Sequence, residues 1–173
     1  MWSKTKKQLE ELTCTTLKNR VKIFVTQYRK SHDQHGRVCI LVDGKEVFHM
    51  CDLKYNVNLW NKEIELRENP EMRMHKESYS IYWEADEIIR NQGIFNKDHF
   101  FDAIAQYLNN PIDNSLNSEN MIVTILALLD RRVGKRTLNN LNIEMKKQPT
   151  MVQYFYKLRC EAEEIIWGIF QIL

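Results

Sequence analysis

The sequence predicts a single α+β domain over residues 1–173, in which an N-terminal three-stranded antiparallel meander packs on a C-terminal helical bundle. Three observations predict this fold. Segments with strand periodicity lie within residues 1–52, and segments with helical periodicity follow over residues 53–173. An Asp-Gly pair separates two of the strand patterns. The chain has five Gly and three Pro, too few for an all-β fold with many tight turns.

The predicted strands are residues 21–28, 37–42 and 45–50, where β-branched and other apolar residues recur with a period of two. The Asp43-Gly44 pair fits a type I′ turn, which requires a positive φ at both positions. A two-residue turn also sets the register of the hairpin. In that register Ile40 faces Val47, and Cys39 faces Phe48.

Helices are predicted on both sides of the sheet segment. Residues 4–12 form a short amphipathic helix that turns Leu9 and Leu12 inward. Residues 53–66 are ambiguous, because an Asn-Val-Asn sequence lowers their helix propensity. Residues 78–91 carry a helical apolar stripe. Asn96 can cap a further helix that runs to residue 108.

The C-terminal part of the bundle is predicted in the same way. Residues 109–117 are expected to form a loop, after which Asn117 or Ser118 can cap a strongly apolar helix through residue 129, at the centre of the bundle. Further helices are predicted over residues 135–145 and from Pro149-Thr150 onward. The last one has an apolar stripe formed by Phe155, Leu158, Ile165, Ile166 and Ile169.

Composition indicates a cytoplasmic protein. No apolar run approaches the roughly 18 residues that span a bilayer, and acidic residues follow the basic N-terminus where a signal peptide needs an apolar segment. The four cysteines are scattered without a C-x-x-C pair, which favours reduced thiols. Residues 1–50 carry ten basic and five acidic residues, a net charge of +5; residues 51–173 carry 15 and 18, a net charge of −3. Such asymmetry can signal an anionic partner.

A polar loop between the first two strands carries the first candidate site, residues 29–37. His32 or His35 could act as a general base, with Asp33 orienting the imidazole ring. Arg29 and Arg37 could hold an anion. The alternative is an ordinary solvated hairpin loop, in which these residues carry no chemistry.

A second candidate site surrounds a predicted helix–Gly–helix joint. Four cations flank Gly134, and the backbone N–H groups that begin the next helix could join them in binding phosphate; the four are Arg131, Arg132, Lys135 and Arg136. The segment is not a P-loop, because it lacks the upstream glycine at the required spacing. The structural alternative is that these cations complement the dipole of the preceding helix and that Asp130 pairs with one of them.

Other signals are weaker. His49 and Cys51, with Cys39 on the next strand, could be metal ligands, but a structural zinc site shows two tight ligand pairs, so no metal and no cofactor is predicted. Glu84, Asp86 and Glu87 are expected to form an acidic solvated face, and tryptophans at helical stripes are expected to be core anchors, namely Trp60, Trp83 and Trp167. Nucleic-acid binding would use the basic residues Lys4, Lys6, Lys7, Lys18, Arg20 and Lys22 if they share a face.

Several segments together resemble a family of small bacterial proteins of unknown function. They are residues 2–4 (WSK), 17–21 (LKNRV), 28–31 (YRKS), 42–47 (VDGKEV) and 130–136 (DRRVGKR). The resemblance spans most of the chain. It implies a bacterial, cytosolic, stand-alone protein, and it implies no activity, cofactor or catalytic residue.

The leading functional hypothesis is a non-enzymatic binding or adaptor domain for a protein or polyanionic partner. The alternative is a small enzyme that acts on a phosphate- or carboxylate-bearing substrate, with the two candidate sites converging in one pocket. A third hypothesis is a homodimer with residues 121–129 at the interface, although a place inside the bundle is favoured for that helix.

Overall fold

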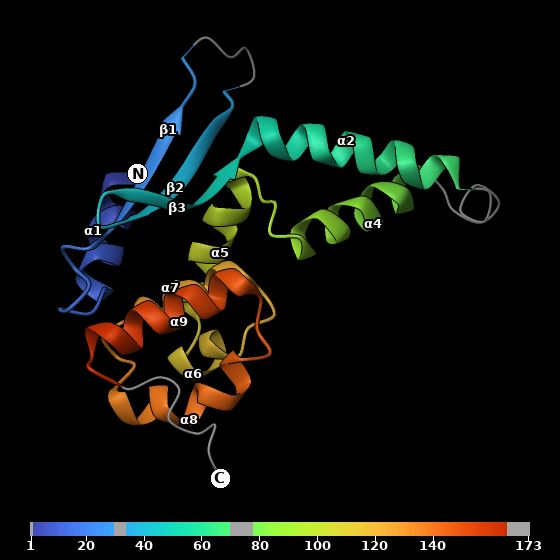
Figure 1. The fold of residues 1–173 in the computed structure, drawn as a ribbon. Coiled ribbons are helices and arrows are strands. Elements are labelled where there is room, and N and C mark those ends of the chain that lie inside the picture. The colour runs from blue at the N-terminus through green and yellow to red at the C-terminus, as the bar shows by residue number, and fades with distance from the viewer. Residues whose placement is uncertain (1, 30–33, 70–77, 166–173) are drawn as a thin grey trace. The chain divides into compact units, whose positions relative to one another are not determined.

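The structure is a computed structural model that describes residues 2–29, 34–69 and 78–165. Its α+β fold confirms the predicted class: a three-stranded antiparallel sheet near the N-terminus is followed by helices (Figure 1). In chain order the elements are α1 (Trp2–Leu12), β1 (Val21–Gln27), β2 (Gly36–Val42), β3 (Lys45–Cys51), α2 (Asp52–Glu68), α4 (Ser78–Asn91), α5 (Lys97–Asn109), α6 (Ile112–Leu116), α7 (Met121–Leu129), α8 (Lys135–Met145) and α9 (Thr150–Ala162). None of these helices is long and apolar enough to cross a membrane.

The sheet has the order β1-β2-β3 that the sequence predicts. Asp43 and Gly44 have φ angles of 51° and 80°, which confirms the positive φ at both positions of the β2–β3 turn. At the other end of β2 the chain requires a glycine for a different reason. A Cβ atom at Gly36 would lie 2.4 Å from the carbonyl oxygen of Thr26, so β1 and β2 can approach only because residue 36 has no side chain.

The chain divides into two compact units. Unit 1 comprises residues 1–23, 41–46 and 101–173, and unit 2 comprises residues 24–40 and 47–100. Unit 1 is built around α7, which is buried from Ile122 through Leu129 and contacts α6 and α9. This burial confirms α7 as a central helix. The segment after α1 is tied to the end of α7, because the N–H of Cys14 donates to the Leu129 carbonyl over 2.8 Å.

Unit 2 contains a pair of helices, α2 and α4. Their shared core consists of Tyr55 and Leu59 from α2 and Ala85 and Ile89 from α4. The ambiguous segment is therefore a helix of 17 residues. Its inward face gains enough from packing on α4 to override the low propensity of its Asn-Val-Asn sequence, because tertiary contacts outweigh propensities of a few tenths of a kcal/mol.

Several sequence-based expectations were wrong in detail. The expected loop over residues 109–117 contains the short helix α6. The cap of α7 is Asn120, whose Oδ1 accepts a hydrogen bond from the Ile122 N–H, and not Asn117 or Ser118. The last helix ends at Ala162, so Ile165 lies outside it, and Ile166 and Ile169 fall outside the described residues.

Two tryptophans expected in the core are on the surface. Trp60 is 66% exposed on α2 and Trp83 is 50% exposed on α4. Helical periodicity places an apolar residue on a stripe, but it does not say whether another element covers that stripe. Trp167 lies outside the described residues.

Candidate functional site

The turn between α7 and α8 is organised by a buried carboxylate. Asp130 is 1% exposed and ends α7. Its Oδ1 accepts a hydrogen bond from the backbone N–H of Arg132 over 2.7 Å, which closes an Asx-turn. Its Oδ2 accepts from the Tyr107 hydroxyl over 2.5 Å and from Nε and Nη2 of Arg132 over 2.9 and 2.6 Å. The predicted pairing of Asp130 with a neighbouring cation is confirmed, and the partner is Arg132.

The charges of this network reinforce one another. Burial raises the pKa of Tyr107, and the hydrogen bond to the Asp130 carboxylate adds to that rise. The hydrogen bonds to Asp130 also raise the pKa of Arg132. Tyr107 therefore stays a hydrogen-bond donor and Arg132 stays a cation, so the buried carboxylate keeps all four of its donors. The network fixes the shape of the turn.

A buried arginine contacts the same turn from the interior of unit 1. Arg159 of α9 is 3% exposed, and its Nη2 donates to the Val133 carbonyl over 2.8 Å. Its Nη1 lies 3.2 Å from Glu163 Oε1, but neither Nη1 nor Nε has a partner in hydrogen-bonding geometry. Burial accordingly lowers the pKa of Arg159. Arg159 is therefore an interior residue, and it holds the turn in place by binding the backbone carbonyl of Val133.

Three cations remain on the outside of this turn. Arg131, Lys135 and Arg136 are exposed, and none of them makes an ion pair with a described residue. Gly134 is the N-cap of α8, whose first turn has no acidic residue and no side-chain cap. These three cations with the first backbone N–H groups of α8 are called the basic turn below. The arrangement concentrates positive charge on a rigid support.

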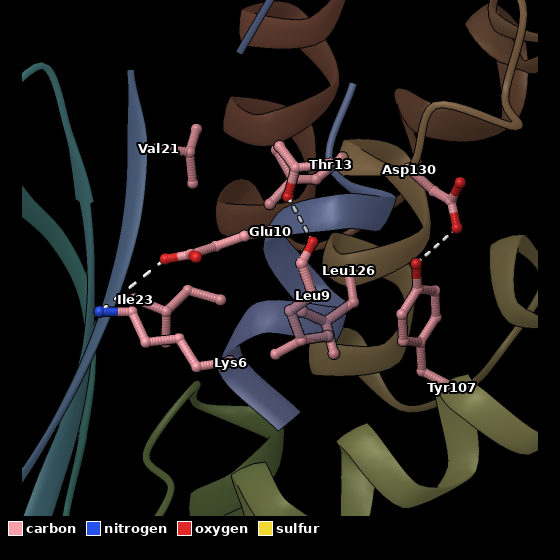
Figure 2. Close-up of a pocket in the computed structure, with 10 residues that line it drawn as sticks. Lys6, Leu9, Glu10, Thr13, Val21, Ile23, Tyr107, Leu126 and Asp130 are labelled. Carbon is pink, nitrogen blue, oxygen red and sulfur yellow. Dashed lines mark hydrogen bonds and ion pairs between the residues drawn. The ribbon is translucent and has the colours of Figure 1, made fainter. Parts of the chain in front are cut away.

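A small cavity lies beside Asp130 in unit 1, between α1, β1 and α7 (Figure 2). Its volume is about 30 Å³. The walls are formed by Lys6, Leu9, Glu10, Thr13, Val21, Ile23, Tyr107, Leu126, Leu129 and Asp130. Space of this size holds one or two water molecules, whereas sites for metabolites enclose roughly 300 Å³ or more. The cavity therefore does not offer a substrate site.

The loop of the first candidate site belongs to unit 2. His32 and Asp33 lie outside the described residues. Arg29 is exposed and lines an open concavity of about 660 Å³ together with Val25, Thr26, Gln27, Tyr28 and Gln34. Arg37 is half-buried in β2. The role of these residues in anion binding or catalysis stays a prediction, as does a composite site with the basic turn of unit 1.

His35 is held near a buried carboxylate that the sequence did not single out. Its Nδ1 lies 4.0 Å from Oδ2 of Asp52, the first residue of α2. The two oxygens of Asp52 accept from the backbone N–H groups of Gly36 and Lys97, each over 2.7 Å. Asp52 thus joins the start of β2 to the start of α5, a structural role. Its signal in the sequence would have been an acidic residue at the junction between a strand and a helix.

A second buried carboxylate corrects the expected acidic face of α4. Asp86 is 3% exposed, while Glu84 is half-buried and Glu87 is exposed. The Tyr55 hydroxyl donates to Oδ1 of Asp86, and Arg90 Nε lies 2.8 Å from Oδ2. Asp86 directly follows Ala85 and precedes Ile89 by three positions, so it belongs to the apolar stripe of α4. That spacing could have identified it.

His99 completes this cluster. Its Nδ1 accepts the backbone N–H of Asn96 over 3.2 Å, so the ring proton is on Nε2, which lies 3.7 Å from Asp86 Oδ1. The Asn96 side chain in turn accepts the N–H of His99 over 2.8 Å, which confirms Asn96 as the cap of α5. The ring also stands edge-on to Tyr55 and Phe95, with centroids 5.1 and 5.9 Å away. Burial raises the pKa of Tyr55, and the hydrogen bond to Asp86 contributes.

The predicted basic surface near the N-terminus is partly neutralised. Lys6 and Lys7 of α1 lie 3.8 and 3.9 Å from Glu10 and Glu11, and Arg20 binds Asp43 with a closest distance of 2.8 Å.

All four cysteines are free thiols, and Cys14, Cys39 and Cys160 are buried. In the described ranges, no three His, Cys, Asp or Glu side chains are grouped so that they could hold a metal ion.

These features define an α+β protein with a basic turn anchored on a buried Asp–Tyr–Arg network. The chain belongs to the SF0329 protein family, whose model matches residues 1–160. The match confirms the resemblance to a family of unknown function, and the family's description states no activity. No curated protein and no solved structure matches the chain.

Proposed function

We propose that the protein is a non-enzymatic binding module that docks an acidic segment of a partner protein on the basic turn. The observation that carries this proposal is the exposure of Arg131, Lys135 and Arg136 without an ion pair to any described residue, on a turn that Asp130 and Arg159 hold rigid. A rigid support reduces the entropy lost on binding. Cations that make no ion pair with a described residue can bind a partner without giving up such a pair.

The surface next to the basic turn favours a protein over a nucleic acid. Ile143 is 69% exposed and lies seven residues after Arg136 on α8, with the exposed Asn140 between them on the same face. A face that combines cations with an exposed apolar side chain suits a segment with both acidic and apolar residues. Nucleic acid would need a longer row of cations along its phosphates, and the ion pairs of Lys6, Lys7 and Arg20 interrupt the N-terminal row.

A bacterial origin and a cytosolic location are part of the same proposal. The resemblance of the chain to small bacterial proteins supports a bacterial origin. The four free cysteines support a cytosolic location, because thiols stay reduced in the cytosol.

Fluorescence anisotropy of three labelled probes tests the proposal. The probes are a peptide of alternating Glu and Leu residues, an all-Glu peptide and a single-stranded DNA oligonucleotide. We expect the Glu–Leu peptide to bind most tightly, with an affinity that falls as salt is added. The triple variant Arg131→Ser/Lys135→Ser/Arg136→Ser should weaken binding at least roughly tenfold, as expected for loss of several charge contacts.

A matched control removes the same charge elsewhere. Lys4, Lys7 and Lys18 are exposed, and their replacement by Ser should leave peptide binding within about twofold, since they are outside the docking surface. Ile143→Ser should weaken binding of the Glu–Leu peptide more than that of the all-Glu peptide. Preferential binding of DNA, lost in the Lys4/Lys7/Lys18 variant, would show that the partner is a nucleic acid. No binding of any probe would refute the proposal.

A further inference from the structure

Helix α2 has apolar residues on two opposite faces. The inner face, with Tyr55 and Leu59, packs on α4. The outer face carries an exposed stripe of four residues, called the α2 stripe: Leu53 (50% exposed), Val57 (57%), Trp60 (66%) and Ile64 (39%). Ile64 is nine residues from Tyr55, and at about 100° per residue this turns it to the opposite side of the helix. The stripe is thus opposite the face that α4 covers.

The spacing of the α2 stripe is that of a helix interface. Its members follow one another at intervals of four, three and four residues, which is the a/d pattern of a helix that packs along a second helix. Half of the large exposed apolar side chains in the described chain belong to it. Contiguous exposed apolar side chains of this kind mark interaction surfaces.

We propose that this stripe docks on the same stripe of a second copy, with the two α2 helices antiparallel about a two-fold axis between Val57 and Trp60. In this arrangement Leu53 lies opposite Ile64 of the second copy, and Val57 lies opposite Trp60 of the second copy. The small Val57 meets the large Trp60, and Leu53 meets Ile64, which is of equal size, so the side chains fill the space between the helices. The pattern is therefore complementary to itself, as an isologous interface requires.

Charge at the edge of the stripe selects the antiparallel direction. Lys54 and Glu65 are both exposed and are separated by about three full helical turns, so they lie on the same flank. An antiparallel two-fold pair places this flank of both copies on the same side of the interface and brings Lys54 of each copy to Glu65 of the other. In a parallel two-fold pair the two flanks lie on opposite sides of the interface, so Lys54 and Glu65 gain no such contact. Glu65 now binds Lys62 over 2.5 Å, a surface ion pair that costs little to rearrange. The helix dipoles also favour antiparallel packing.

The size of the stripe predicts a weak dimer. Four side chains per copy are about a fifth of the residues in a standard interface, so we expect a dissociation constant on the order of 10 µM. This interface is distinct from residues 121–129, which are buried inside a single chain apart from half-buried Met121. It is also independent of the proposed function, because the basic turn lies on unit 1. Each dimer would carry two basic turns.

Sedimentation velocity of the full chain over a dilution series tests the dimer. We expect the wild type to pass from monomer to dimer as concentration rises, and Val57→Glu/Trp60→Glu to stay monomeric with an unchanged circular dichroism spectrum. Ile143→Glu is the matched control, because it places a charge on a more exposed apolar side chain of α8 and should dimerise as the wild type does. A wild type that is monomeric throughout, or a double variant that still dimerises, would overturn the proposal.

Charge reversal tests whether the two α2 helices pack antiparallel, and it needs no change in the α2 stripe. Lys54→Glu and Glu65→Lys should each weaken the dimer roughly tenfold, because each places like charges together twice. The double reversal Lys54→Glu/Glu65→Lys should restore wild-type affinity. In a parallel dimer these flanks lie on opposite sides of the interface, so neither single reversal would weaken the dimer, and that result would overturn the antiparallel arrangement. Binding of the Glu–Leu peptide by a monomeric variant would show that the basic turn functions without this interface.

Discussion

The two units of the protein each bury an aspartate beneath a tyrosine hydroxyl and an arginine, but they satisfy it differently. In unit 1, Asp130 receives hydrogen bonds from Tyr107, from two nitrogens of Arg132 and from a backbone N–H. In unit 2, Asp86 receives one from Tyr55, while Arg90 Nε lies 2.8 Å away outside hydrogen-bonding geometry.

The difference follows from the position of each aspartate in its helix. Asp130 ends α7, where the next N–H groups have no helical partner and can turn toward the carboxylate. Asp86 is inside α4, where the neighbouring N–H groups are committed to the helix. Its partners must therefore be side chains from other turns and elements: the Tyr55 hydroxyl donates to it, and His99 Nε2 lies 3.7 Å away. A carboxylate at a helix end can be satisfied locally, and one inside a helix depends on tertiary structure.

The largest expected effect comes from removing each carboxylate. Asp130→Ala should lower the free energy of unfolding by about 2–4 kcal/mol, because it leaves the Tyr107 hydroxyl and a backbone N–H without a partner and removes the ion pair to the half-exposed Arg132. Asp86→Ala should cost less, about 1–3 kcal/mol, since it leaves mainly the Tyr55 hydroxyl unsatisfied. Urea unfolding of both variants measures the two costs. Equal costs, or a larger cost at Asp86, would contradict the comparison.

The two arginines offer a matched pair, because their side chains are 44% and 42% exposed. Arg132→Gln loses two hydrogen bonds to Asp130, and Arg90→Gln loses an ion pair without a hydrogen bond. We expect a loss of about 1–2 kcal/mol at Arg132 and about 0–1 kcal/mol at Arg90, both reduced by solvent screening. Thermal unfolding at two salt concentrations measures them. A cost at Arg90 that matches or exceeds that at Arg132 would show that geometry does not separate the networks.

The smallest effect is expected at an exposed pair, which serves as the reference for both buried ones. The side chain of Asp43 is 53% exposed and binds Arg20. The hydrogen bonds from Arg20 hold the pKa of Asp43 below its usual value of 3.8. Asp43→Asn keeps a residue that tolerates positive φ in the β2–β3 turn and removes only the charge.

The pH dependence of that variant has a definite sign. Because the folded pKa of Asp43 is lowered, the pair stabilises the protein above the unfolded pKa, and this contribution is lost as pH falls through the folded pKa. Wild type should therefore unfold at a slightly higher temperature than Asp43→Asn at neutral pH, and the difference should vanish well below pH 3.8. A difference that grew on acidification would show that the turn, and not the ion pair, is responsible.

Much of the fold could be predicted because its causes are local. The β2–β3 hairpin follows from the Asp43-Gly44 pair, because these residue types tolerate the positive φ that the turn requires. The helices other than α2 and α6 follow from the period of their apolar residues. Part of the basic turn was equally accessible: Asp130 and Arg132 are two residues apart, so their pairing needs only a turn. The cap of α7 was misplaced by two or three residues, since several neighbouring polar residues can cap a helix.

The sequence by itself determined the order of strands and helices, the hairpin turn and the cations around Gly134, because each depends on residues near one another in the chain. Only the tertiary structure decided that Asp86 is buried and Trp60 exposed. Both follow from which face of α2 and of α4 meets the other helix. Helix α2 is apolar on two opposite faces, so its period alone cannot choose between them; Tyr55 and Leu59 find partners on α4, and the α2 stripe is left outside.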